Sequence, residues 1–479
     1  MKPNLLSTLA CLALLGLAGC ATETATGRRT EQDAAEARQV RTILDRWLEA
    51  EGGAQRIGRV GAVETRLVME YGSGSMKMKL TRHKWKAADG RYRFETELPT
   101  GGVTVEAYDG RVAWRRNERL GFGLVSPPEL ERTLASEDLR WQLKVELNYP
   151  GRRLLADAAA AGRPCHVLAM AKRRGGVEKW FVDAESGQLL RIEEVTQPGR
   201  GANVTMEFSD YRRVDGLLVP FLERRTENGT TLLVQRQSVV VDPPLDAAMF
   251  TPPAAELRDG REVERLLTRH LESLGSIDAF VRLHSRVTAA TVNVVTSGLK
   301  YHMNISQKQP NFVLNEQEIP GVGRVVQGYD GTTAWVNSEV QGYRTLKGEE
   351  LQQVLANADM RAEAQLRWRC PLWRLLGERE INGRRARGVA LAALQGFVGN
   401  HYFDVENGRL LRIESNVSAG PGGNLAVTIE FSDFRSVDGL TMPFVTTVTN
   451  PAVQSVTTVE SVRTNVPLDD AIFKPRKDD

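Results

Sequence analysis

Cys165 and His166 are adjacent residues of the types that a nucleophile and its general base require. Neighbouring residues of an extended strand point to opposite faces, so these two side chains would not form a direct pair. The second half of the chain has Ala386 and Arg387 at the corresponding place. The pattern therefore argues against thiol catalysis.

Other chemistry-bearing residue types give no catalytic pattern. None of the six histidines stands in the zinc-binding spacing His-Glu-x-x-His, and the chain has no Gly-x-Ser-x-Gly elbow or Gly-Lys-Ser/Thr phosphate loop. Most of the recurring aspartates precede glycine or end an extended run, which indicates turns and not a carboxylate cluster. These aspartates are Asp109, Asp210, Asp215, Asp330, Asp433 and Asp438. We expect no catalytic residue, no metal and no cofactor.

Cys20 is the one residue with a specific chemical expectation. Lys2 and the short apolar run Leu5 to Leu17 precede Leu17-Ala18-Gly19-Cys20, which matches the lipobox cut by bacterial signal peptidase II. The run is shorter than the ~20 apolar residues that span a bilayer. We therefore predict a signal peptide over residues 1–19 and lipidation of Cys20, with several acyl chains that anchor the protein to a membrane.

The rest of the chain indicates a body outside the cytoplasm. Residues 20–37 are rich in alanine, threonine and charge without an apolar period, which predicts a flexible tether. Basic and acidic residues are interspersed at a net charge of +3, so no nucleic-acid partner is expected. Cys165 and Cys370 either pair across domains or remain two separate buried thiols, and the second arrangement is favoured.

The chain contains one domain twice. Tyr108-Asp109-Gly110 with Trp114 recurs as Tyr329-Asp330-Gly331 with Trp335. Five further marks recur at an offset of 221 to 223: Asp183 to Gly187, Phe208-Ser209-Asp210, Val214-Asp215-Gly216, Pro220-Phe221, and Pro244-Leu245-Asp246 closing on Phe250. Such a period is a whole domain, since solenoid repeats run about 20 to 50 residues. We predict domains over residues 38–253 and 261–476, joined by a linker over 254–260.

Each copy opens with an amphipathic helix and continues as strands. Val40, Ile43, Leu44, Trp47 and Leu48 lie on one helical face before Gly52-Gly53, and Val263 to Leu274 repeat the pattern before Gly275. Alternation such as Met76, Met78, Leu80 then predicts antiparallel strands, about eleven per copy. A second helical stretch interrupts them, roughly over 128–147 and 349–376. The fold class is mainly antiparallel β with few helices.

Periodicity alone leaves two arrangements open. The sheet either curls over its helices into a closed core, or forms an incomplete barrel whose hollow holds an apolar ligand. Trp47, Trp114 and Trp335 are candidate lining residues of such a hollow, with ordinary core packing as the alternative.

The repeated motifs resemble the LolA/LolB-like lipoprotein-carrier superfamily, in particular proteins labelled outer membrane lipoprotein-sorting protein. The resemblance rests on the Asp-Gly turn before Trp114 and Trp335, and on the closing runs 245–253 and 468–475. It implies two tandem half-barrels, each of about eleven strands with helices as a lid, that bind acyl chains.

The resemblance and the lipobox together give a functional hypothesis. Ala21 after the cysteine implies the outer membrane, facing the periplasm. We expect a lipid-anchored protein that binds lipid or an acylated lipoprotein as carrier, acceptor or sensor, with an envelope protein as a further partner. The alternative is a non-catalytic structural or interaction module with self-packed barrels.

Overall fold

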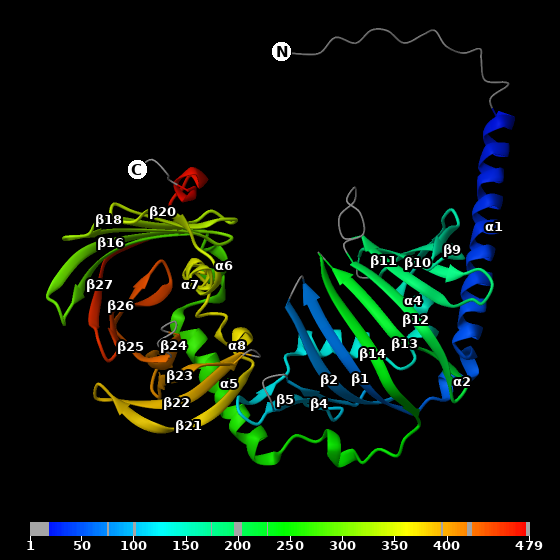
Figure 1. Ribbon diagram of the computed structural model, residues 1–479, viewed down its shortest axis with the longest axis horizontal. Helices are drawn as coiled ribbons and strands as arrows, with labels where there is room; N and C mark the ends of the chain where they lie inside the picture. Colours follow the sequence, from blue (N-terminus) through cyan, green and yellow to red (C-terminus); the bar gives the residue numbers. More distant parts are fainter. Residues whose placement is uncertain are drawn as a thin grey trace, which may run out of the picture. The chain divides into compact units, whose positions relative to one another are not determined.

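The computed structural model describes residues 19–73, 76–98, 102–173, 175–195, 204–227, 229–393, 396–418 and 424–475. Contacts divide the chain into two compact units (Figure 1). Unit 1 comprises Met1–Arg111 and Pro127–Thr251, and unit 2 comprises Val112–Ser126 and Pro252–Asp479. The predicted signal peptide over 1–19 lies outside the described residues except for Gly19. No helix in the described part of the chain is long and apolar enough to cross a membrane.

The segment Val112–Ser126 joins unit 2, although the sequence places it in domain 1. Its second strand pairs with β21 (Leu372–Ile381) through Phe122 and Trp373, whose rings meet edge to face at 5.3 Å. A Cβ at Gly123 would lie 1.8 Å from the carbonyl oxygen of Pro371, so this close approach requires glycine. Contacts distant in the sequence therefore decide where this hairpin belongs.

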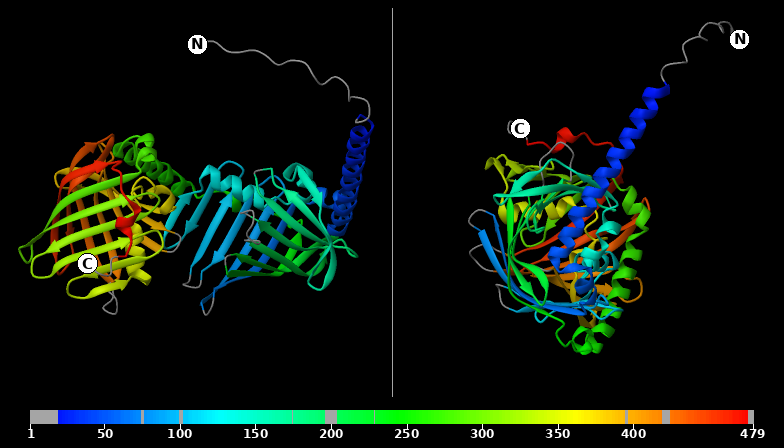
Figure 2. Two further views of the ribbon diagram at one scale, coloured as in Figure 1. Left: turned by 90° about the horizontal axis from the view of Figure 1, so that it is seen from above. Right: turned by 90° about the vertical axis from the view of Figure 1, so that its right-hand side faces the viewer.

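Unit 1 opens with the 33-residue helix α1, Gly19–Glu51. Its apolar face packs into the core through Val40, Leu44 and Trp47, and positive φ angles at Gly52 and Gly53 end it. Figure 2 shows the N-terminal part of α1 projecting away from the strands of unit 1. The other helices of unit 1 are α2 Gly53–Arg59, α3 Pro127–Ser136, η1 Trp141–Lys144, α4 Val145–Asn148 and η2 Ala247–Phe250.

Residues 20–37 lie in α1, contrary to the expected flexible tether. Alanine, glutamate, glutamine and arginine favour helix, and the segment continues directly into the amphipathic part that the core stabilises. A periodic apolar face is not needed for such an extension.

Unit 2 repeats this helical arrangement with changed boundaries. Its helices are α5 Ala254–Leu274, α6 Ile277–Arg282, α7 Gly348–Ala358, α8 Leu366–Arg369 and η4 Asp470–Phe473. The predicted linker 254–260 is the first part of α5, because Pro252-Pro253 mark a helix start and helix formers follow. The predicted helical stretch 349–376 ends early, since β21 begins at Leu372.

The strands of unit 1 form one antiparallel sheet in the order β4–β3–β2–β1–β14–β13–β12–β11–β10–β9, with β7 and β8 both paired to β9. The first and last strands, β1 and β14, are neighbours. The bounds are β1 Ala62–Ser73, β2 Met76–Ala87, β3 Tyr92–Glu97, β4 Val103–Tyr108, β7 Gly151–Leu154, β8 Ala158–Ala160, β9 Arg163–Ala171, β10 Val177–Asp183, β11 Leu189–Val195, β12 Val204–Val214, β13 Leu217–Glu227 and β14 Thr230–Val241.

The strands of unit 2 follow the same plan in the order β20–β19–β18–β17–β16–β15–β27–β26–β25–β24–β23–β22–β21–β6–β5. The bounds are β5 Ala113–Asn117, β6 Gly121–Leu124, β15 Ser285–Val294, β16 Leu299–Lys308, β17 Phe312–Ile319, β18 Gly323–Tyr329, β19 Ala334–Ser338, β20 Gly342–Thr345, β21 Leu372–Ile381, β22 Arg384–Ala393, β23 Gly396–Asp404, β24 Leu410–Ser418, β25 Asn424–Val437, β26 Leu440–Thr449 and β27 Gln454–Thr464.

The predicted fold class is confirmed: each unit is an open, curved, mainly antiparallel sheet with few helices (Figure 2). The described residues contain fourteen strands, β1–β14, before Thr251, more than the predicted eleven. The surplus consists of strands of three or four residues, such as β6, β7 and β8, in which alternation cannot be detected.

The repeated Phe-Ser-Asp and Pro-Phe motifs form the same local break in strand pairing in both units, without a shift of register. Asp210 and Asp433 have φ angles of 51° and 50° and stand outside the ladder, beside the pairs Tyr211↔Pro220 and Phe434↔Pro443. Proline offers no N–H to a ladder, so Pro220 and Pro443 suit a place where strand pairing is interrupted. In unit 2 the Asp433 carboxylate holds Arg435 (2.6 Å), whose guanidinium lies 4.4 Å from the ring centroid of Phe444. Asp210 and Asp433 thus lie inside β12 and β25, and not in the turns that the sequence predicts for these acids.

Candidate ligand-binding site

The hollow of unit 2 encloses a cavity of about 420 Å³. Helix α7 lies inside the curve of the sheet and forms one wall (Figure 1), and strands β15–β18, β26 and β27 form the others. Its apolar lining consists of Met303, Ile305, Val313, Val354, Met442 and Val459, together with Val462. Ligand pockets commonly measure about 300–1,000 Å³, so this cavity is large enough for a small apolar ligand.

Strand alternation explains why these side chains face the cavity. Ile305 on β16 is opposite Thr288 on β15 and Asn315 on β17. Side chains of directly paired residues lie on the same face of a sheet, and all three line the cavity. The neighbours His302 and Asn304 therefore point to the opposite face.

One part of the cavity wall is polar. The Arg286 guanidinium donates to Gln307 Oε1 at 2.9 and 2.7 Å, and Gln307 Nε2 donates to the carbonyl of Asn357 at 2.6 Å. Glu363 also lines the cavity, and its side chain is open to it. The surrounding protein atoms raise the pKa of its carboxyl, whereas the positive charge of Arg286 lowers that pKa. Buried Asn315 Oδ1 has no hydrogen-bond partner among the residues that the structure describes. The wall thus offers hydrogen bonds as well as apolar area.

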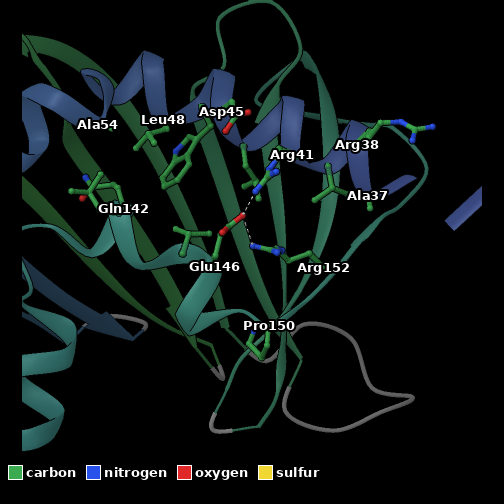
Figure 3. Close-up of a pocket in the computed structure, with 15 residues that line it drawn as sticks. Ala37, Arg38, Arg41, Asp45, Leu48, Ala54, Gln142, Glu146, Pro150 and Arg152 are labelled. Carbon is green, nitrogen blue, oxygen red and sulfur yellow. Dashed lines mark hydrogen bonds and ion pairs between the residues drawn. The ribbon is translucent and has the colours of Figure 1, made fainter. Parts of the chain in front are cut away.

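A second cavity, of about 590 Å³, lies in unit 1 between α1 and the segment 142–152 (Figure 3). Figure 3 shows Arg41 from α1 and Arg152 from the opposite wall pointing toward Glu146; each guanidinium is 3.4 Å from its carboxylate. Val40, Leu44 and Trp47 line the apolar part. Since no residue of the sheet except Arg152 lines it, this cavity is a groove beside α1 and not the hollow.

Of the three candidate tryptophans, Trp47 lines the groove beside α1, and none lines the hollow of unit 2. It is 1 % exposed and sits in an aromatic cluster, with ring centroids 5.5 Å from Trp141 and 5.4 Å from Trp180. Tyr149 completes the cluster at 5.2 Å from Trp180. Ligand contact by Trp47 stays a prediction.

Trp335 and Trp114 are packing residues. Trp335 is fully buried with Leu314, Val326 and Phe473, and its indole N–H donates to the Phe473 carbonyl at 2.9 Å. Leu314 and Val326 alternate with the cavity-lining Val313 and Gln327, so Trp335 packs on the face opposite the hollow. Trp114 is 3 % exposed and stacks on Phe122 at 6.0 Å.

The chemistry-bearing side chains are placed apart or held in structural roles. Cys165 is buried, whereas His166 is half-buried and contacts Asp157 (3.2 Å), so the two do not form a pair. Cys165 and Cys370 are both free buried thiols. Backbone N–H groups of the following turn donate to Asp109 and Asp330. The described residues contain no cluster of three His, Cys, Asp or Glu side chains that could hold a metal ion.

Sequence reasoning missed the charged groups of the core. Asp183 and Asp404 are each 1 % exposed; burial opposes ionisation, but turn N–H donors and Arg163 or Arg384 outweigh it and lower the pKa of both. Burial lowers the pKa of His270 and His401 to about 4 and raises that of Glu51, at the end of α1, to about 7. The sequence did carry a signal for Asp183 and Asp404: their partners Arg163 and Arg384 also recur at an offset of 221.

Cys20 lies in the backbone of α1, and its side chain is outside the described part of the chain. Lipidation there stays a prediction.

Comparison with known proteins gives similarity of structure only. No family model matches the sequence, and no curated protein matches it. A DUF1329 family protein from Desulfovibrio piger is similar in structure, with 13 % identity over 44 % of this chain and 97 % of its own length, at a TM-score of 0.35. A putative outer membrane lipoprotein-sorting protein domain from Vibrio parahaemolyticus matches with 13 % identity over 45 % of this chain and 97 % of its own length, at a TM-score of 0.34.

A LolA superfamily protein from Nitrosomonas europaea matches with 12 % identity over 44 % of this chain and 97 % of its own length, at a TM-score of 0.31. At these identities and scores, any functional conclusion depends on the geometry of this chain. The chain is similar in structure to LolA superfamily proteins, the resemblance that its repeated motifs predict.

Proposed function

We propose that this protein binds a lipid or an acylated ligand in the hollow of unit 2. The observation that carries the proposal is the cavity of about 420 Å³ between the sheet and α7, in which eight of the fifteen lining residues are apolar. This open cavity favours binding over the alternative of a self-packed barrel. A lipid anchor at Cys20 and a place at the outer membrane, facing the periplasm, belong to the same proposal, in which the protein acts as carrier, acceptor or sensor without catalysis.

Burial of apolar area supplies the binding energy in this proposal. Each methylene moved from water into the cavity contributes about 0.8 kcal/mol. Eight methylenes would contribute roughly 6 kcal/mol before the costs of ordering the ligand are subtracted. Affinity should therefore increase with chain length until the cavity is full.

The test uses the chain from Ala21 onward, which lacks the acylated cysteine and so any acyl chains of its own. Extraction of the purified protein and lipid mass spectrometry should find a bound acyl ligand, or one that loads from added fatty acids. Ile305→Trp fills the hollow and should weaken binding of an uncharged acyl ligand, such as a fatty acid methyl ester, at least tenfold.

His302→Trp is the matched control, because His302 is on the same strand, points to the other face and has a side chain that is 75 % exposed. It should leave binding unchanged. A wild-type chain that neither carries nor loads acyl ligand, at any chain length, would contradict the proposal.

A further inference from the structure

The strand of unit 1 that corresponds to the cavity wall of unit 2 carries a row of cations. On β2, Arg82, Lys84 and Lys86 follow Leu80 at alternate positions and therefore share its face. Their opposite neighbours on β1 are Leu67, Thr65 and Val63. The side chains of Lys84 and Lys86 are only 16 % and 19 % exposed.

The register identifies this face as the hollow of unit 1. Lys84 is opposite Thr65 and Phe94, just as Ile305 is opposite Thr288 and Asn315 in unit 2. Arg82, Lys84 and Lys86 thus correspond to Met303, Ile305 and Gln307, all three of which line the unit 2 cavity. The two copies have kept the fold and exchanged neutral for cationic side chains.

Glu137, just after α3, partly neutralises these cations. Lys84 Nζ is 2.6 Å from both of its carboxylate oxygens, and Lys86 Nζ is 3.3 Å from one. Arg82 Nε donates to the Thr96 hydroxyl at 2.9 Å.

The charged groups nearest to these cations do not remove the excess. Arg236 is 3.5 Å from Glu223, and Glu106 accepts a hydrogen bond from the Tyr92 hydroxyl at 3.2 Å. Farther along the same face, Arg225 pairs with Glu227, and Lys172 contacts Glu178 and Glu194. Near β2, four cations, Arg82, Lys84, Lys86 and Arg236, thus face three carboxylates, Glu106, Glu137 and Glu223. A half-buried excess of positive charge is unfavourable unless an anion compensates it.

Apolar side chains and open space continue along the same face. Leu67, Met69 and Leu80 form a buried cluster with Tyr71 and Leu232 packed against it. Tyr71 and Leu232, with Arg225, Glu227 and Thr230, line a cavity of about 470 Å³ at the end of these strands. A charged group near Lys84 would therefore have apolar surface beside it for an attached chain.

We propose that unit 1 binds an anionic amphiphile, with its carboxylate or phosphate headgroup at Arg82, Lys84 and Lys86 and its apolar chain along Leu80 and Met69. The two units then take ligands of different charge: unit 1 requires an anionic headgroup and unit 2 does not. Burial lowers the pKa of Lys84 to about 8, against the opposing effect of the Glu137 carboxylate. This inference extends the proposed lipid binding to a second site.

The test isolates unit 1 by using the chain from Ala21 onward with Ile305→Trp, which blocks the unit 2 cavity. The probes are a fluorescent fatty acid and its methyl ester. The acid should bind at least tenfold more tightly than the ester, because hydrogen bonds to charged groups are the stronger ones.

The decisive variant replaces three residues of unit 1 by their unit 2 counterparts: Lys84→Ile, Lys86→Gln and Glu137→Ala. Removing both lysines together with the carboxylate leaves two cations, Arg82 and Arg236, near two carboxylates, Glu106 and Glu223. Binding of the ester should therefore persist while the preference for the acid falls at least tenfold. Lys84→Arg with Lys86→Arg keeps the charge and should keep the preference, which separates a charge effect from misfolding.

Competition distinguishes the headgroups. Displacement of the probe by phosphatidic acid assigns a phosphate headgroup, and displacement by unlabelled fatty acid alone assigns a carboxylate. Displacement of the probe by inorganic phosphate at the same concentrations would contradict the proposal of an amphiphilic ligand, since no apolar chain would then be needed. Equal binding of acid and ester, or loss of all binding with Ile305→Trp, would overturn the inference and leave the unit 2 proposal intact.

Discussion

Glu51→Gln should stabilise unit 1 at alkaline pH. Glu51 ends α1, is 8 % exposed, and burial raises its carboxyl pKa from 4.5 to about 7. A folded-state pKa above the unfolded value favours the protonated form, so this contribution is complete below pH 4.5 and is lost as pH rises through about 7. Glutamine has nearly the same shape and does not titrate.

The difference of pKa values sets the magnitude. At ~1.4 kcal/mol per pKa unit, ionisation of Glu51 removes about 3 kcal/mol of stability between pH 4.5 and pH 8. Glu51→Gln should therefore unfold like the wild type at pH 4.5 and be about 3 kcal/mol more stable at pH 8. In a domain of this size the melting temperature rises by roughly 2–4 °C per kcal/mol, or on the order of 10 °C here.

Differential scanning calorimetry at several pH values measures this effect on the unit 1 transition. Glu49→Gln is the control, because Glu49 is exposed on the same helix. A Glu51→Gln transition that shows the wild-type pH dependence would refute the assignment of a neutral Glu51 in the folded state.

Three further predictions concern unit 2 and the repeated turns. Burial holds the pKa of His270 and His401 at about 4, so the stability that they contribute is complete above pH 6.5 and falls toward pH 4. Protonation of each histidine in the unfolded state should lower the free energy of unfolding of unit 2 by about 2 kcal/mol between pH 7 and pH 5. His270→Phe should therefore flatten the calorimetric pH profile of unit 2. Phe473→Ala, at a fully buried side chain under Trp335, should lower the free energy of unfolding of unit 2 by about 3–5 kcal/mol in denaturant titrations; a loss below about 1 kcal/mol would show that the closing segment is not part of the core. Asp433→Gly should be nearly neutral and Asp433→Val should cost about 1–2 kcal/mol, because the residue has a φ of 50°; equal melting temperatures for the two variants would contradict this left-handed backbone conformation.

The repeated motifs predicted local structure well where a residue has a conformational preference of its own. Asp215 and Asp438 occupy turns at positive φ, and Asp210 and Asp433 have positive φ where strand pairing is interrupted. The amphipathic faces of α1 and α5 are buried as their spacing indicates. These outcomes follow from short-range chemistry that a sequence displays directly.

The predictions about lining residues were less successful because alternation identifies two faces without telling which one encloses space. Trp335 is apolar and on a strand, yet it lies on the face opposite the hollow, under Phe473. Lys84 and Lys86 are charged, yet they lie on the hollow side with little exposure. The closing segment covers part of the outer face, so polarity alone does not assign the two faces.

The sequence by itself determined the duplication, the β-rich class, the turn positions and the helix that opens each unit, since all of these depend on residues near one another in the chain. Only the tertiary structure decided that Phe122 pairs beside Trp373, that α7 leaves a cavity against β16, and that Lys84 meets Glu137. These contacts join residues tens to hundreds of positions apart. They depend on strand order and sheet curvature, which balance many small packing terms across the whole unit.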